Sequence, residues 1–138
     1  MAPDFTLADL DGGVFRLSDH RGSVVLIDFM ATWCGPCRAS MPGLKALHEE
    51  LGDRVVLISI SVDPTHDTEP LLKDWKEGYE AGWIHARDLA DPPVSQLYKV
   101  RGVPTLVFVG KQGKIRYTHV GLTSEETLRE ELLTLLGE

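Results

Sequence analysis

The sequence predicts an α/β fold with a mixed central sheet, helices on both faces and an N-terminal β-hairpin, in one domain over residues 1–138. Short apolar runs typical of buried strands alternate with longer segments of helical periodicity, an order that favours parallel pairing in the middle of the sheet. A turn sequence near the C-terminus joins two further strand-like runs and predicts an antiparallel edge. With 43% hydrophobic and 25% charged residues, the chain has a globular composition and can bury a core without disulfide or metal staples.

The first strand-like segments lie near the N-terminus. Residues 4–17 carry apolar side chains around a turn at residues 11–13, Asp-Gly-Gly, which predicts a small hairpin. Residues 24–30, Val-Val-Leu-Ile-Asp-Phe-Met, are apolar on both faces except at Asp28. A strand of that pattern is covered on both sides and lies in the centre of a sheet.

Helices and a second buried strand follow. Apolar residues at helical spacing predict a helix over residues 36–51 that ends at Gly52, and Pro42 inside it predicts a kink. Residues 54–62 predict a second buried strand, and residues 68–80 predict a mostly polar helix. The apolar side expected of that polar helix consists of Leu71, Leu72 and Trp75.

The last third of the chain completes the predicted sheet. Residues 92–99 predict a short helix or turn, and residues 105–109 predict a third core strand. Residues 111–114 predict a hairpin turn, with residues 115–120 as its return strand. Ser124 is placed to cap a final helix. The buried stripe expected of that helix consists of Leu128, Leu132, Leu135 and Leu136.

The composition excludes several classes of protein. Lysine and arginine total 14 and aspartate and glutamate total 21, which gives a net charge of −7. We therefore expect no nucleic-acid partner, because phosphate binding needs a basic patch. No apolar run approaches the ~20 residues of a membrane-spanning helix, so the domain itself is expected to be soluble. Two cysteines, Cys34 and Cys37, are too few for a structural zinc site or a disulfide scaffold. The pair indicates redox chemistry, with no metal and no bound cofactor.

The Cys-x-x-Cys motif joins the end of a buried strand to the start of a helix. Free N–H groups and the helix dipole stabilise a thiolate at such a position. Cys34, at the cap, can be exposed and is the expected nucleophile, whereas Cys37, one turn further in, is shielded and resolves the mixed disulfide. Gly35 and Pro36 are expected to be structural residues of the active site, since the φ of proline suits the first turn and keeps the two sulfurs within bonding range.

Asp28 is a carboxylate in the middle of a predicted buried strand. Ionising it without a partner is costly, so burial is expected to raise its pKa. A carboxyl of that kind near a thiol pair can accept and return a proton. We expect it to deprotonate Cys37 when that thiol attacks the mixed disulfide. The alternative is an aspartate that local hydrogen bonds satisfy and that takes no catalytic part.

The sequence resembles the thioredoxin family over nearly the whole chain. Residues 33–37, Trp-Cys-Gly-Pro-Cys, match the active-site pentapeptide of that family, and residues 103–105, Val-Pro-Thr, are similar to its cis-proline loop. The opening segment, residues 2–22, and the insertion at residues 63–90 resemble the thioredoxin-like oxidoreductases of the TlpA and ResA type, whose opening hairpin the peroxiredoxins share. The resemblance implies a thioredoxin-like fold and a thiol–disulfide oxidoreductase that acts on protein disulfides.

Further roles follow from the resemblance. In the family the proline loop lies against the active-site sulfurs, which implies a cis bond between Val103 and Pro104 and leaves the backbone of Val103 free to pair with an extended substrate. Trp33, next to the nucleophile, is expected to be a half-exposed platform for substrate. The alternatives are an ordinary trans proline at a strand start and a tryptophan that only shields the motif.

The resemblance also implies partners and a location. Members of the group are commonly anchored outside the cytoplasmic membrane and reduce protein disulfides, for example during cytochrome c maturation. It therefore implies protein substrates with disulfides and a separate thiol electron donor such as a membrane reductase, and it favours an extracytoplasmic, membrane-anchored protein that works as a monomer. A cytoplasmic location is the alternative, since the N-terminus lacks the features of a signal peptide.

The chain departs from the TlpA and ResA group in two places. The dipeptide inside its motif, Gly35-Pro36, is that of thioredoxin itself. Asp28 stands where the thioredoxin pattern has its buried acid, whereas many members of the group carry a neutral residue there. Both departures favour a reductant over an oxidant.

Two other functions stay open. The shared hairpin suggests a thiol peroxidase, but peroxiredoxins resemble a Pro-x-x-x-Thr-x-x-Cys pattern, whereas Thr32 lies two residues before Cys34 without the preceding proline. A copper-binding or copper-chaperone module would pair the cysteines with a distal histidine, for which only His119 is a candidate.

Overall fold

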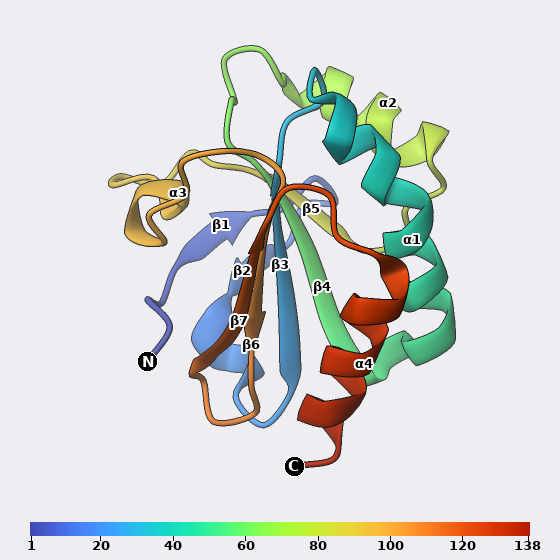
Figure 1. The fold of residues 1–138 in the computed structure, drawn as a ribbon. Coiled ribbons are helices and arrows are strands. Elements are labelled where there is room, and N and C mark those ends of the chain that lie inside the picture. Colours follow the sequence, from blue (N-terminus) through green and yellow to red (C-terminus); the bar gives the residue numbers. More distant parts are fainter.

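A five-stranded mixed sheet forms the centre of the molecule (Figure 1). Its strands are β3 (Val24–Met30), β4 (Val55–Ser61), β5 (Ile84–Arg87), β6 (Thr105–Val109) and β7 (Ile115–Val120). The computed structural model, which describes residues 1–138, places them in the order β5-β4-β3-β6-β7. β4 is parallel to β3 and β5, whereas β6 is antiparallel to β3 and β7. The predicted mixed sheet is therefore confirmed.

Helices and a hairpin cover the two faces of this sheet. The remaining elements are β1 (Thr6–Ala8), β2 (Val14–Arg16), α1 (Gly35–Leu51), α2 (Glu69–Gly78), α3 (Val94–Leu97) and α4 (Glu125–Leu136), with 3-10 turns at Leu17–His20 and Gly52–Arg54. Figure 1 shows α1, α2 and α4 on one side, and the β1–β2 hairpin with the short α3 on the other. The N-terminal hairpin and the helices on both faces are thus as predicted. None of the helices combines the length and the apolar character that a membrane span requires.

β3 divides the core into two layers. All of its residues are buried, and successive side chains of a strand point to opposite faces. Val24 and Leu26 pack beneath α1 and α4, whereas Val25 and Ile27 pack against the hairpin. Asp28 follows Val24 and Leu26 in this alternation. Its carboxyl group therefore lies on the face that α1 covers.

α1 begins at the Cys-x-x-Cys motif. Cys34 is its N-cap and Pro36 lies in its first turn. The helix continues across Pro42 and ends at Gly52, which has a φ of +54° that a glycine adopts at little cost. Its buried side chains recur at helical spacing and face the sheet; they are Cys37, Ser40, Met41, Leu44, Leu47 and Leu51. The spacing that fixes this face also turns Cys37 inward.

The strand β5 is an element that the sequence analysis does not predict. It pairs in parallel with β4 and closes one edge of the sheet. Its four residues, Ile-His-Ala-Arg, contain two polar side chains and so lack the apolar run that marks the other core strands. His85, in the middle of β5, is 1% exposed. Tertiary packing, rather than local pattern, makes this segment a strand.

The inserted region also packs differently from the sequence-based expectation. On α2, Leu72 is fully buried, but Leu71 is 38% exposed, because adjacent residues of a helix point about 100° apart. Trp83, which follows α2, belongs to the main core beneath α1 and α4. On α4, Leu136 is only partly buried, whereas the other three predicted leucines are core residues.

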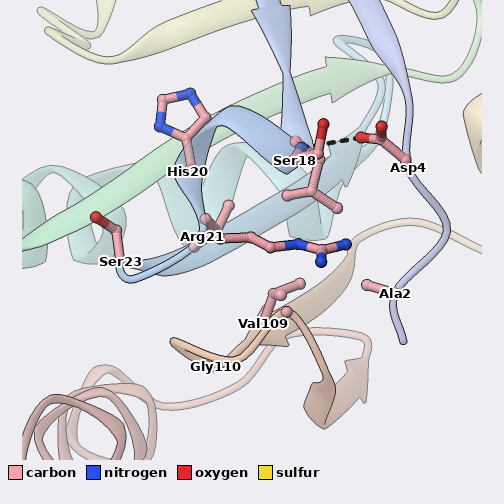
Figure 2. A pocket seen from close by; sticks show the side chains of 11 residues that line it. Ala2, Asp4, Ser18, His20, Arg21, Ser23, Val109 and Gly110 are labelled. Carbon is pink, nitrogen blue, oxygen red and sulfur yellow. Dashed lines mark hydrogen bonds between the residues drawn. The ribbon is translucent and has the colours of Figure 1, made fainter.

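The N-terminal segment is tied to the end of the sheet that lies away from the cysteines. The Ala2 N–H donates to the Gly113 carbonyl at 2.8 Å, and the Ser18 N–H donates to Asp4 Oδ1 at 2.9 Å. Figure 2 shows the small cavity that these segments enclose, with Arg21 among its lining residues. Its volume of about 10 Å³ leaves room for about one water molecule. This cavity is therefore too small for a substrate.

Replacing Leu72 by Ala should destabilise the protein far more than replacing Leu71 by Ala. Leu72 is fully buried in the cluster that contains Cys34 and Cys37, so its truncation leaves a cavity and should cost about 2–5 kcal/mol. Leu71 is 38% exposed and should cost less than about 1 kcal/mol. Urea unfolding of the two variants measures the difference. Equal losses would contradict this orientation of α2.

Candidate active site

The two cysteines lie where β3 gives way to α1. The Sγ of Cys34 accepts a hydrogen bond from the Cys37 N–H at 3.2 Å, and the Cys34 thiol donates to the Val103 carbonyl at 3.5 Å. Both thiols are free. The sulfur of Cys34 thus faces the N-terminal N–H groups of a helix, where negative charge is favoured.

Cys34 is less exposed than the sequence analysis expects. It is 5% exposed and Cys37 is 1% exposed, because Cys34 packs in a cluster with Met30 and Leu72. Cys34 nevertheless lines an open groove, whereas Cys37 does not. The two sulfurs therefore differ in access through this groove rather than in overall exposure.

The groove beside Cys34 has a volume of about 610 Å³. Residues 33–36 of the motif and residues 100–103 of the loop before β6 line it, together with Val62 and Ser95. Trp33 is 52% exposed, as expected, and its indole N–H donates to Asp63 at 2.9 Å. An extended polypeptide could lie along this surface with its disulfide next to Cys34.

The proline loop lies against the motif. The bond between Val103 and Pro104 is cis, as the resemblance implies. Val103 lines the groove, whereas Pro104 is buried behind it and its carbonyl accepts the Gly121 N–H at 2.8 Å. The structure therefore brings Trp33, Cys34 and Val103 to one surface and places Pro104 as its support.

Asp28 is a buried carboxyl group on β3, 1% exposed. The Ser59 hydroxyl donates to its Oδ2 at 2.7 Å, whereas its Oδ1 has no hydrogen-bond partner in the protein. Burial raises the pKa of Asp28 to about 6, although the hydrogen bond from Ser59 opposes the rise. A carboxyl group that titrates close to neutral pH can take up and release a proton during a reaction.

The Cys37 thiol is difficult to ionise. Burial and its hydrogen bond with Cys34 raise the pKa of Cys37 well above the ordinary range, and the charges of Cys34 and Asp28 raise it further. A hydrogen bond with the Ala31 backbone opposes this shift. Cys37 therefore needs a base before it can attack, and Asp28 is close enough to influence its titration.

Asp67 is a fully buried carboxylate beside the motif that the sequence analysis does not identify. It accepts hydrogen bonds from the Thr32 N–H at 3.0 Å, from the Ser61 hydroxyl at 2.6 Å, and from the Thr32 hydroxyl and His66. Burial alone would raise the pKa of Asp67, but these donors, led by Ser61 and Thr32, hold it below its usual range. Asp67 thus anchors the backbone two residues before Cys34.

The side chains that the two alternative functions would use are engaged elsewhere. His119, which the copper alternative needs, pairs with Glu131 of α4 at 2.7 Å. The Thr32 hydroxyl donates to Asp67. The structure contains no group of three or more His, Cys, Asp or Glu side chains placed to hold a metal ion.

Comparisons with known proteins agree with this geometry. A model of the AhpC/TSA family matches residues 1–118. The thioredoxin-like protein YneN of Bacillus subtilis is 29% identical over 131 residues, which cover 95% of this chain and 76% of YneN. The thiol-disulfide oxidoreductase ResA of Geobacillus thermodenitrificans is 30% identical over 136 residues, which cover 95% of this chain and 74% of ResA. The crystal structure of the exposed lipoprotein thioredoxin Etrx1 of Streptococcus pneumoniae, 33% identical, superposes with a TM-score of 0.81 and covers 96% of this chain and 100% of that one.

Two of the buried aspartates, Asp28 and Asp67, should affect stability in opposite directions. The folded state binds a proton on Asp28 more tightly than the unfolded chain, so ionisation of Asp28 opposes folding as pH rises from 3.8 to about 6. Asp28→Asn should escape this penalty and gain up to roughly 3 kcal/mol at pH 7. The lowered pKa of Asp67 means that its charge stabilises the fold above its unfolded pKa, so Asp67→Asn should lose stability at pH 7.

Urea unfolding of both variants between about pH 2 and pH 8 provides the measurement. The advantage of Asp28→Asn over the wild type should grow from pH 4 to pH 6 and then level off, because the folded pKa has been passed. The loss in Asp67→Asn should stay constant down to the unfolded pKa of 3.8 and shrink below it, as pH falls toward the lowered folded pKa of Asp67. A less stable Asp28→Asn at pH 8 would contradict the charge assignment of Asp28.

Proposed function

Because the chain belongs to the AhpC/TSA family and is a thiol–disulfide oxidoreductase of the ResA type with a thioredoxin fold, we propose that it reduces disulfides of protein substrates through Cys34 and Cys37. The observation that carries this proposal is the position of the Cys34 sulfur. It accepts the Cys37 N–H at the start of α1 and also lines an open groove. A reactive thiol needs both an environment that favours the thiolate and a surface that the substrate can reach.

Cys34 is the nucleophile of the first step. Its thiolate attacks one sulfur of the substrate disulfide, the substrate S–S bond breaks, and the other substrate sulfur leaves as a thiolate that takes up a proton. A mixed disulfide now joins Cys34 to the substrate. Trp33 offers an exposed indole surface to the bound chain, and the backbone at Val103, supported by Pro104, borders the groove where an extended segment can pair.

Cys37 and Asp28 complete the reaction. Cys37 gives its proton to Asp28 and attacks the Cys34 sulfur, which releases the second substrate thiolate and forms the Cys34–Cys37 disulfide. Two electrons have then passed from the dithiol to the substrate. The proton on Asp28 returns to solvent or to the leaving sulfur. Gly35 and Pro36 keep the two cysteines on the first turn of α1, so that their sulfurs can reach each other.

The direction of this reaction requires an external electron donor, and the named relatives support a location. An external thiol donor must restore the Cys34–Cys37 dithiol after each cycle, because the substrate takes both electrons. We place the protein outside the cytoplasmic membrane as a monomer with a membrane thiol reductase as donor, and cytochrome c maturation is the process that we assign to it. Support comes from the ResA relatives and from Etrx1, which is described as an exposed lipoprotein.

A Cys37→Ser variant should accumulate a mixed disulfide between Cys34 and a protein substrate. The serine hydroxyl cannot attack the mixed disulfide, so the reaction stops after its first step. Non-reducing electrophoresis with mass mapping of the adduct provides the measurement, using a reduced variant and a disulfide-bonded test protein. Cys34→Ser, the matched control, should form no adduct. Continued turnover of Cys37→Ser without an adduct would show that the two-cysteine mechanism is wrong.

A further inference from the structure

A buried hydrogen-bond chain reaches Asp28 from the edge of the sheet. The Trp83 indole Nε1 donates to the Ser59 hydroxyl at 2.9 Å, and the Ser59 hydroxyl donates to Asp28 Oδ2 at 2.7 Å. Trp83 is 3% exposed and Ser59 is fully buried. Water therefore has no ready access to either bond, and each polar atom depends on its protein partner.

The chemistry of the three groups fixes the direction of this chain. An indole N–H can only donate, so the Ser59 oxygen must accept from Trp83. A hydroxyl carries a single hydrogen, and that of Ser59 is directed to Asp28 Oδ2. Oδ2 is therefore an acceptor and does not carry a proton itself. Oδ1, which has no partner in the protein, is the oxygen left to bind one.

The geometry points to Ser59 and Trp83 as positioning residues of the reaction: they hold Oδ2 of Asp28 as an acceptor, so that the proton of Cys37 arrives at Oδ1. This inference rests on the proposed role of Asp28 as the base for Cys37. Ser59 acts directly by orienting the carboxyl group. Trp83 acts through Ser59, because donation to the hydroxyl oxygen polarises its O–H bond and strengthens its donation to Asp28.

The surroundings supply no cation to Asp28. Asp28 is in register with Ser59 on β4 and Leu106 on β6, and Ser59 is in register with His85 on β5. Burial lowers the pKa of His85 to about 4, so this imidazole is neutral at physiological pH. On α1 with its N-cap, α2, α4 and the strands β4 to β7, the buried titratable side chains are Cys34, Cys37 and His85, and no cation contributes to the pKa of Asp28. Lys76 pairs with Asp11 and His119 pairs with Glu131, so the hydroxyl of Ser59 is the donor that Asp28 has.

Carbon-13 NMR titration of the Asp28 carboxyl group in the reduced protein tests the chain directly. Trp83→Phe removes the indole donor but keeps an aromatic ring, and it should raise the titration midpoint of Asp28 by about half a pH unit, since the carboxylate loses stabilisation. Trp75→Phe is the matched control, because the Trp75 indole N–H has no hydrogen-bond partner in the protein. It should leave the midpoint unchanged.

Two substitutions of Ser59 extend the test. Ser59→Ala removes the donor itself and should raise the midpoint by roughly one pH unit, whereas Ser59→Thr keeps the hydroxyl and should restore the wild-type value. The rate at which a preformed mixed disulfide resolves should follow the same order. In Ser59→Ala this rate should fall about threefold at pH 6.5 and recover at pH 8.5. A substitution that merely loosened the fold would not shift the pH profile in this way.

The outcomes separate this inference from the proposed function. Unchanged midpoints in both Trp83→Phe and Ser59→Ala would overturn the inference. If Asp28→Asn resolves the mixed disulfide slowly, shifted midpoints with an unshifted pH profile of resolution would overturn it as well. If Asp28→Asn resolves at the wild-type rate, the proposed role of Asp28 is wrong and the inference falls with it. Shifted midpoints together with a shifted resolution profile would support both.

Discussion

The hydrogen bond from the Cys37 N–H to the Cys34 sulfur, at the first turn of α1, is the interaction on which the site depends. It fixes Cys34 as the cap of the helix and so brings its sulfur to the positive end of the helix dipole. The same turn directs Cys37 into the core, on the face of α1 that covers Asp28. One local contact thus gives the two cysteines different roles, because it leaves Cys34 at the groove and turns Cys37 into the core.

Asp28 and Asp67 show how the number of donors decides the behaviour of a buried carboxyl group. Asp67 is surrounded by hydroxyl, amide and imidazole donors, which hold its pKa below the usual range despite its burial. Asp28 has one donor, Ser59, and burial raises its pKa to about 6. A fully satisfied carboxylate suits a structural anchor, and Asp67 holds the backbone at Thr32. A carboxyl group with one free oxygen suits proton exchange.

The local sequence pattern was sufficient to predict the strands and helices that are determined by residues close together in the chain. Residues 24–30, 105–109 and 115–120 are strands with the predicted bounds, because continuous apolar runs and a turn sequence mark them. Ser124 caps α4 as predicted, since its hydroxyl accepts the Thr127 N–H at 3.2 Å. The motif itself also located both cysteines at a strand-to-helix junction, since its composition and position are local features.

Features that depend on long-range contacts could not be predicted in this way. β5 becomes a strand only because it pairs with β4. Ser59 and Asp67 look like ordinary polar residues in the sequence, and their partners Asp28 and Thr32 lie 31 and 35 residues away along the chain. The low exposure of Cys34 arises in a cluster that includes Met30 of β3 and Leu72 of α2, and no spacing within the motif reveals this packing.

The most direct test of this account is a stopped-flow comparison of the wild type with Asp28→Asn against a disulfide-bonded protein, with formation and resolution of the mixed disulfide resolved as separate phases. Asp28→Asn should slow resolution of the mixed disulfide by about a hundredfold near pH 7, the scale of general-base catalysis, while attack by Cys34 should change little. Equal resolution rates in the two proteins would contradict the central claim that Asp28 takes the proton of Cys37.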